Sequence, residues 1–530
     1  MAIDHLPTDH ALSRRALLGL GAGAAGAAVA GVSTPAFAGG GSAWPSGALP
    51  LSAATRIDTS QFFSAQQLAT WGAEANALGL RATGAPNHEA YLRKLKRRFE
   101  RAGLHDVRLE PVPMTRWLAD SWSVEVGGRV LPDTYYVPYS RATEATGLTA
   151  EMVYVPLREA LLGSTSDIAE KIATVLAGVD VSGKIAVFEV PYTSFPVAAF
   201  QLLSYPGAFD ADGRDTSGTY NRPWFNFVVQ CLDALAEAGA AGTVGIWHDL
   251  PGSWARQYSP YDGVFRPIPG LWVDSVEGAT LKEKAASGEV ATITLQATTQ
   301  DVVTHNLIGF IPGESKQLTV LHTHTDGTNG MEENGQIGIL ATAQYLARLP
   351  RRALGRTVMV MLSTGHFAGG VGIRHFLAQH AATLVPRITS IVTLEHLGCR
   401  EFLPDEQGVP VSTGQSELGA YFTPNAPGLV DASVNAHHRV GNAGTVCRPF
   451  VPSPADAEQP VGWPGEGVYF WWYGSIPTSN YITGPYGLIT ADLDTTGMVD
   501  YRLMRKIAIS TVRTVIQLGR TPRQDLHVIA

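Results

Sequence analysis

The second half of the chain alternates between short, mainly apolar runs and segments with helical spacing. The apolar runs are 318–321, 358–362 and 388–394, and the helical segments are 335–349, 370–380 and 504–518. A strand that is apolar at every position is buried on both faces, and such strands occur in parallel sheets covered by helices. The pattern therefore predicts an α/β fold with a central, mostly parallel sheet flanked by helices.

The first 38 residues have the pattern of a targeting segment. Ser13-Arg14-Arg15 precedes a soft apolar stretch at 16–32, and Ala36-Phe37-Ala38 offers small residues for signal-peptidase cleavage. Paired arginines in this position are typical of the twin-arginine export route, so we expect a periplasmic or secreted protein. A Gly/Ser/Pro-rich linker is expected at 39–54. The later chain contains no run of 18 apolar residues, which predicts no membrane span in the mature form.

The length and the charge narrow the classes of function. A chain of 530 residues is too long for one ordinary core, so at least two domains are expected. The net charge is −8, and this mildly acidic balance gives no support for a nucleic-acid partner. Cys231, Cys399 and Cys447 are too few for a disulfide framework, although one bridge remains open.

Residues 131–300 have a different sequence pattern, in which short apolar segments that predict strands are separated by Gly and Pro turns. This stretch resembles a protease-associated domain, and three features carry the resemblance. They are Gly183-Lys184-Ile185-Ala186-Val187, the small-residue helix end at 238–242, and Pro269-Gly270-Leu271-Trp272-Val273. The resemblance implies an inserted β-rich α+β domain that has no chemistry of its own and shapes substrate access.

Histidines and carboxylates cluster directly after three of the predicted strands. His322, His324 and Asp326 follow the first strand, His366 follows the second, and Glu395 and His396 follow the third. Ligands of open α/β sheets bind at the carboxyl ends of the strands, so these side chains should converge. Imidazole and carboxylate groups together favour a zinc-like ion.

The same region resembles the co-catalytic di-zinc aminopeptidases, a family that also includes glutamate carboxypeptidases. The resemblance begins with Asn306-Leu307-Ile308-Gly309 and Ile311-Pro312-Gly313, and it continues through a strand to His324-Thr325-Asp326. It covers about residues 65–520. It implies a peptidase-like domain formed by 55–130 and 301–530, with the protease-associated domain inserted at 131–300.

The resemblance also implies roles for individual residues. His324, Glu333 and Glu395 fall on metal ligands, Asp326 falls on the carboxylate that orients a ligand, and His366 falls on the general base. Phe367 stands where the family has a second-metal ligand, and no histidine lies between His438 and His527 to supply another. We therefore expect one zinc ion and a lost second site. A register shifted by one residue would instead make His366 a ligand.

These features predict an exported metal-dependent hydrolase in which an activated water attacks an amide carbonyl of a peptide or small-molecule substrate. Two alternatives remain. One is a non-catalytic binding protein on the same fold, and the other is a hydrolase of a non-peptide amide or ester with a rearranged ligand set such as His322, Asp326, His366 and His396.

Glu332-Glu333 could also simply begin a solvated helix capped by Asn329. The aromatic run 469–473 is expected to be a buried strand. The sequence leaves the oligomeric state open.

Overall fold

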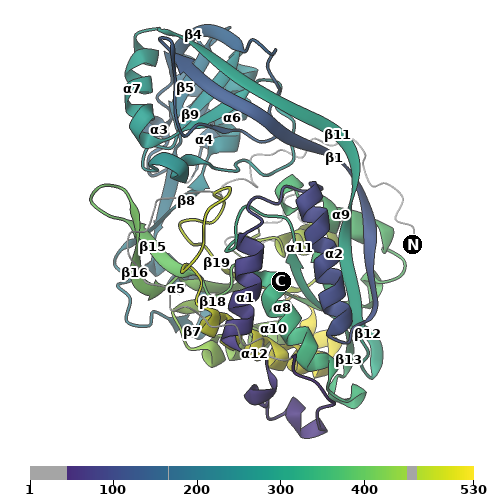
Figure 1. Ribbon diagram of the computed structural model, residues 1–530. Helices are drawn as coiled ribbons and strands as arrows, with labels where there is room; N and C mark the ends of the chain where they lie inside the picture. The colour runs from purple at the N-terminus through teal and green to yellow at the C-terminus, as the bar shows by residue number, and fades with distance from the viewer. Residues whose placement is uncertain (1–43, 165, 450–461, 530) are drawn as a thin grey trace.

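The computed structural model describes residues 44–164, 166–449 and 462–529, and the predicted signal segment lies outside these ranges. Two halves are joined by two long strands, β1 (His105–Val126) and β11 (Val290–Ile311), which pair antiparallel and run from one half into the other (Figure 1). The expected domain boundary at 300/301 falls inside β11. The strand continues through that point because both halves use it as part of their sheets.

The larger half is built on the predicted sheet. β13 (Arg356–Ser363), β12 (Ser315–His324), β14 (Ile388–Leu394) and β19 (Thr478–Thr483) lie side by side and parallel. The sheet is extended by β11 on one side, and on the other by β17 (Gly419–Phe422), β18 (Gly444–Cys447) and β7 (Ser204–Asp210). The α/β class with a mostly parallel central sheet is therefore confirmed.

Helices cover both faces of this sheet. They are α1 (Ala65–Asn76), α2 (Pro86–Arg101), α8 (Gly335–Ala347), α9 (Val371–Gln379), α10 (Pro427–Val440), α11 (Val468–Gly474) and α12 (Tyr501–Arg520). α8 carries no charged side chain and is buried along almost its whole length, because α1 and α12 pack against it on one side and β12 on the other. The side chain of Asp500 caps α12 by accepting from the backbone N–H groups of Arg502 and Leu503.

The aromatic run 469–473 forms α11 rather than the expected strand. Phe470 and Trp471 are buried next to each other, whereas Tyr473 is 41% exposed. A strand would place neighbouring residues on opposite faces, but a helix can bury adjacent positions on one side. The helix ends at Ser475, which adopts a left-handed conformation with φ of +47°.

The inserted half differs from the expected β-rich α+β domain. Its strands β4 (Leu148–Tyr154), β5 (Ile185–Glu189), β9 (Gly242–Ile246) and β10 (Gly270–Val273) are parallel neighbours. Helices intervene along the chain, namely α3 (Leu157–Leu161), α4 (Ile168–Leu176), α6 (Val228–Glu237) and α7 (Ser275–Ala286). Parallel strands need such crossover connections, so this half is a second, smaller α/β unit.

Residues 192–226 leave the inserted half and join the larger one, and we call them the arm. The arm contains β6 (Tyr192–Pro196), α5 (Ala198–Leu203), β7 and β8 (Thr219–Asn226). β6 and β8 pair antiparallel in a small two-stranded sheet, while β7 pairs with β18 at the edge of the central sheet (Figure 1). The insertion therefore supplies part of the larger half.

The described part of the expected linker is packed against the protein. Trp44 contacts the rings of Phe63 and Trp71, and the 3₁₀ helix Leu51–Ala54 buries Ala53 and Ala54. These apolar contacts hold residues 44–54 to the larger half, so they do not form a free spacer. Cys231, Cys399 and Cys447 are each buried and unbridged. Within the described ranges, no helix is both long enough and apolar enough to cross a bilayer.

Candidate metal centre

The ends of the parallel strands bring a group of histidines and glutamates together. His324 is the last residue of β12, and it lies in register with Ser363 at the end of β13. His366 follows β13 in a short 3₁₀ turn, and Glu395 and His396 follow β14 directly. Glu332 lies in the turn before α8. The predicted convergence at the carboxyl edge of the sheet is present.

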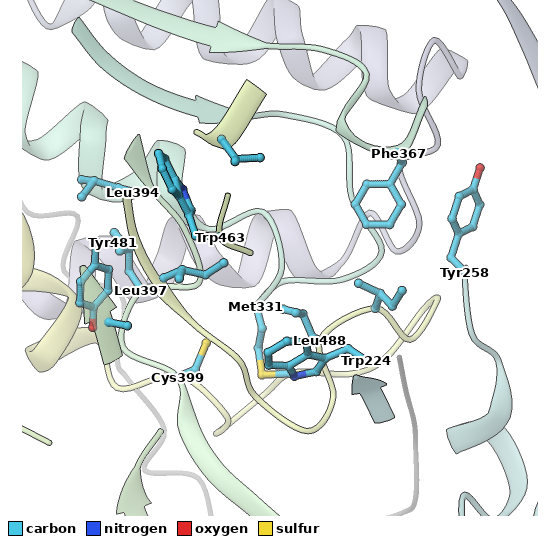
Figure 2. Close-up of a cluster of buried hydrophobic side chains, with 14 of the residues drawn as sticks. Trp224, Tyr258, Met331, Phe367, Leu394, Leu397, Cys399, Trp463, Tyr481 and Leu488 are labelled. Carbon is cyan, nitrogen blue, oxygen red and sulfur yellow. The ribbon is translucent and has the colours of Figure 1, made fainter. Parts of the chain in front are cut away.

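Buried apolar neighbours hold these side chains in place. Met331, Phe367, Leu394 and Leu397 are each adjacent in sequence to a polar residue of the group, and none is more than 1% exposed. Figure 2 shows these four side chains within one cluster of buried hydrophobic residues. Because packing immobilises these four apolar residues, the neighbouring polar side chains project from a rigid backbone.

Glu332 lies at the centre of the group. Its Oε1 atom is 3.5 Å from Nε2 of His324, 3.7 Å from Nε2 of His396 and 3.8 Å from Nε2 of His366. Glu395 Oε2 lies 3.9 Å from Nε2 of His324. Two sets of possible ligands result, His324–Glu332–His366 and His324–Glu395–His396, and in each set the ligand atoms lie within 4.8 Å of one another. Both sets share His324, so they describe one cluster, and we call it the His/Glu cluster.

The hydrogen bonds of two histidines show which ring nitrogens are free. His324 Nδ1 lies 2.8 Å from the main-chain oxygen of Asp326, and His396 Nδ1 lies 2.6 Å from that of Thr483. A carbonyl oxygen can only accept, so Nδ1 carries the proton in both rings. Burial lowers the pKa of His324, and it lowers the pKa of His396 to about 3, so both rings are neutral.

Both Nε2 atoms therefore present lone pairs to the carboxylate oxygen of Glu332. Neither Nε2 atom has a hydrogen-bond partner, although both are buried. Lone pairs that face one another without a proton between them repel electrostatically. A cation bound between them turns this repulsion into attraction. A histidine held through Nδ1–H to a carbonyl, with Nε2 free, is the usual arrangement of a metal ligand. The residues present thus fit a bound divalent metal ion.

The carboxyl groups of the site are costly to ionise without a positive charge beside them. Burial, together with the charges of Asp326 and Glu395, raises the pKa of Glu332 well above its usual range. Burial raises the pKa of Glu395 to about 7, against a lowering by the hydrogen bond from Asn480. Both side chains are fully buried. A metal ion would reverse the cost of ionising them.

Glu333, which the sequence places among the ligands, lies outside the His/Glu cluster. Its carboxylate forms an ion pair with the guanidinium of Arg81, and both side chains are completely buried. Consecutive residues in a turn project in different directions, so one of the two glutamates faces the histidines and the other faces Arg81. A Cβ atom at Gly327 would overlap both carboxylates, so the two side chains can pack against the backbone there only because this residue is a glycine. We therefore replace Glu333 by Glu332 in the candidate ligand set.

Asp326 orients the site differently from the expectation. Its main-chain oxygen, rather than its carboxylate, accepts from His324. The carboxylate accepts from the backbone N–H groups of Gly365, His366 and Phe367 and from the hydroxyl of Thr83. Asp326 thus holds the turn that carries His366.

His366 lies inside the cluster, although the sequence register made it a general base. Its ring centroid is 4.4 Å from that of His324, and its Nδ1 atom is buried without a hydrogen-bond partner. Burial and the neighbouring histidines lower the pKa of His366 well below its usual value, so the ring is neutral. This geometry favours the shifted register, in which His366 is a ligand.

Part of the site was not anticipated. His396 was expected at this edge and in the rearranged set, but not among the ligands that the resemblance implied. His366 lies beside it in the cluster, whereas His322 bonds Ser363 and Thr393. Glu466 is fully buried, accepts from Ser363 Oγ at 2.6 Å, and donates its backbone N–H to both oxygens of Glu395. It comes from a loop far along the chain, and no local motif marks it.

A pocket opens beside the His/Glu cluster. Its lining residues are Phe195, Phe200, Tyr220, Trp224, Phe225, Tyr261, Glu332, His366, Glu395, His396, Leu418, Ala420, Phe422, Pro464, Gly465, Ile482, Thr483, Gly484, Leu488 and Ile489. The empty space within it is about 620 Å³, including open solvent at its mouth. The ionisable end of the pocket is the His/Glu cluster, and the remainder is mainly aromatic and aliphatic.

The fold was compared with known proteins. No protein-family model and no curated protein sequence matches the chain. Among solved structures, the zinc aminopeptidase of Bacillus subtilis aligns with a TM-score of 0.59 and 14% identity, over 88% of this chain and 98% of that one. The aminopeptidase from Aneurinibacillus sp. strain AM-1 gives 0.55 and 15%, over 88% and 94%. A peptidase M28 precursor from Shewanella amazonensis gives 0.57 and 14%, over 86% and 96%.

Proposed function

From a chain with the fold of the zinc aminopeptidases, we propose a metal-dependent hydrolase that cleaves an amide bond in a peptide or small-molecule substrate. One divalent ion, which we expect to be zinc, is held by His324, His366, His396 and Glu332, with Glu395 beside them. When bound, such an ion polarises a carbonyl and lowers the pKa of a coordinated water. Both effects serve hydrolysis.

The protein residues have separate tasks in this proposal. The main-chain oxygens of Asp326 and Thr483 hold two imidazoles with Nε2 towards the ion. The Asp326 carboxylate holds the turn that brings in the third imidazole. Glu395 lines the pocket and lies next to the substrate space, which suits it to accept a proton there. The apolar remainder of the pocket excludes water from the bound substrate.

One observation carries the proposal most directly. Three imidazole nitrogens lie 3.5 to 3.8 Å from one carboxylate oxygen, in a buried site at the carboxyl edge of the sheet. Such a concentration of buried ionisable groups is costly unless a cation or a reaction requires it.

The test combines metal analysis with an amide-hydrolysis assay. We expect the purified protein to contain one zinc equivalent per chain and to hydrolyse amino-acid p-nitroanilides. His396→Ala should lose both the metal and the activity. His438→Ala, which removes an exposed histidine on α10, should lose neither. A protein that keeps its metal but cleaves no amide or ester would favour the binding-protein alternative, and a protein without metal would contradict the proposal.

We also propose export by the twin-arginine route, on the pattern of residues 1–38. Replacing Arg14 and Arg15 by lysine should retain the protein in the cytoplasm. Fractionation of cells that express the two forms would measure this. Equal export of both forms would argue against the route.

A further inference from the structure

Five aromatic residues of the arm form one wall of the pocket. They are Phe195, Phe200, Tyr220, Trp224 and Phe225. Their rings pack in a continuous series, with centroid separations of 4.8 Å between Phe195 and Phe225 and 4.3 Å between Trp224 and Phe225. Because an aromatic wall offers a large, rigid contact area, it favours a bulky apolar group as its partner.

The wall is joined to the His/Glu cluster through two consecutive residues. The Tyr220 hydroxyl and Trp224 Nε1 both donate to the main-chain oxygen of Gly484, each at 3.1 Å. The preceding carbonyl, that of Thr483, orients His396. A side chain at position 484 would overlap the Trp224 ring and the Tyr220 hydroxyl, so glycine allows this close approach. The aromatic wall therefore begins next to the candidate ligands.

Buried charges fasten the arm in this position. Arg222 donates to both carboxylate oxygens of Glu417, at 2.9 and 3.0 Å, and its side chain is 3% exposed. Arg214 and Arg222 both pair with Glu401. An ion pair in a buried setting is geometrically demanding, so it specifies one docking position of the arm.

The distribution of charge along the pocket is uneven. The acidic and imidazole side chains that line it all belong to the His/Glu cluster, and its described lining contains no lysine or arginine. The rest of the lining consists mainly of apolar side chains of the arm and of the central sheet, including Phe422 and Ile482. A charged group on the substrate would be desolvated there without a partner.

We propose that the arm is the specificity element of this enzyme and selects substrates with a large, uncharged aromatic or aliphatic side chain next to the scissile amide. This inference rests on the proposed hydrolase function. A phenylalanyl, tryptophanyl or leucyl group fills the aromatic pocket, whereas alanyl leaves it empty. Lysyl and glutamyl groups bury an unpaired charge.

Kinetics on matched substrates test the arm. We expect kcat/KM for phenylalanine p-nitroanilide to exceed that for the alanine compound by about 10- to 100-fold, the value of burying one large apolar side chain. Trp224→Ala should remove most of this ratio. Phe209→Ala is the matched control, because Phe209 lies in the arm on β7 but does not line the pocket. An unchanged ratio in Trp224→Ala, or a preference for lysine or glutamate compounds, would overturn the proposal.

A binding measurement separates this inference from the proposed function. Phenylalaninol and alaninol have no amide to cleave, so calorimetry reports their binding without turnover. We expect phenylalaninol to bind the wild-type protein at least about 10-fold more tightly than alaninol, and Trp224→Ala to lose this difference. Selective binding without amide cleavage would uphold the pocket and reject the hydrolase. Cleavage without selectivity would do the reverse.

Discussion

Glu332 and Glu333 are adjacent in the chain but have different electrostatic surroundings. Glu332 faces the nitrogens of three histidines, whereas Glu333 is neutralised by Arg81. Both are buried, so burial alone does not distinguish a ligand from a structural ion pair. The partner of each carboxylate decides its role.

The first prediction follows from this difference. Glu332→Gln should weaken metal affinity by more than about 100-fold, because even a residue that only orients a ligand typically contributes 10- to 100-fold. Glu333→Gln should retain one metal per chain. Competition with a chelator of known affinity would measure both variants. Equal metal loss in the two would return Glu333 to the ligand set.

The second prediction concerns the buried ion pair. Arg81→Met leaves the Glu333 carboxylate buried without its cation, and we expect a loss of about 3–5 kcal/mol in the free energy of unfolding. The double variant Arg81→Met/Glu333→Met should recover part of that loss. Urea unfolding of the single and double variants gives the coupling between the two residues. Strictly additive effects would contradict the pairing.

Among the elements, the turn between β13 and α9 depends on one carboxylate. Asp326 accepts from three consecutive backbone N–H groups of this turn, and Gly365, Gly369 and Gly370 all adopt left-handed conformations around it. The turn has no regular hydrogen-bond ladder of its own beyond the short 3₁₀ helix His366–Ala368. The position of His366 therefore depends on a residue from the next strand of the sheet.

The third prediction concerns the role of Asp326 in holding this turn. Asp326→Asn exchanges a carboxylate oxygen for an N–H donor that cannot accept from the backbone, so His366 should lose its fixed position. We expect metal affinity to fall by about 10- to 100-fold while the fold persists. Circular dichroism and a metal titration on the same sample would show both results. Asp500→Ala, which removes a cap of α12 far along the chain, should leave the affinity unchanged and cost about 1 kcal/mol in stability.

On the scale of the whole molecule, the site links elements from distant parts of the chain. Its candidate ligands come from β12, from the turn before α8 and from the segments after β13 and β14, and the arm of the inserted half lines the pocket. A metal bound at this point couples these segments, because it binds the folded site and not the unfolded chain.

The fourth prediction follows from this coupling. Added zinc should raise the melting temperature of the chelator-treated protein, with about 2.7 kcal/mol of stabilisation when its free concentration is 100 times the dissociation constant. His396→Ala should show little of this rise. Differential scanning calorimetry across zinc concentrations would measure it. A melting temperature that does not depend on zinc would count against a built metal site.

The local pattern of the chain predicts much of the larger half. The mainly apolar runs at 318–321, 358–362 and 388–394 lie in β12, β13 and β14, and the polar residues that follow them converge as expected. Strand and helix periodicity are short-range properties, so a single sequence reports them well. The resemblance to zinc aminopeptidases agrees with the observed fold because it rests on these same strand ends.

The exact ligands and the pocket depended on tertiary structure. Sequence spacing cannot tell which of two adjacent glutamates faces the histidines, because this is decided by Arg81, a residue about 250 positions away in the chain. Nor does it reveal that Thr483 orients His396, or that the arm of the insertion packs against Gly484. The sequence by itself determined the sheet and the edge at which chemistry gathers, since those follow from local apolar patterning. Tertiary packing decided which glutamate faces the histidines and which residues line the pocket beside it, since contacts between distant parts of the chain determine both.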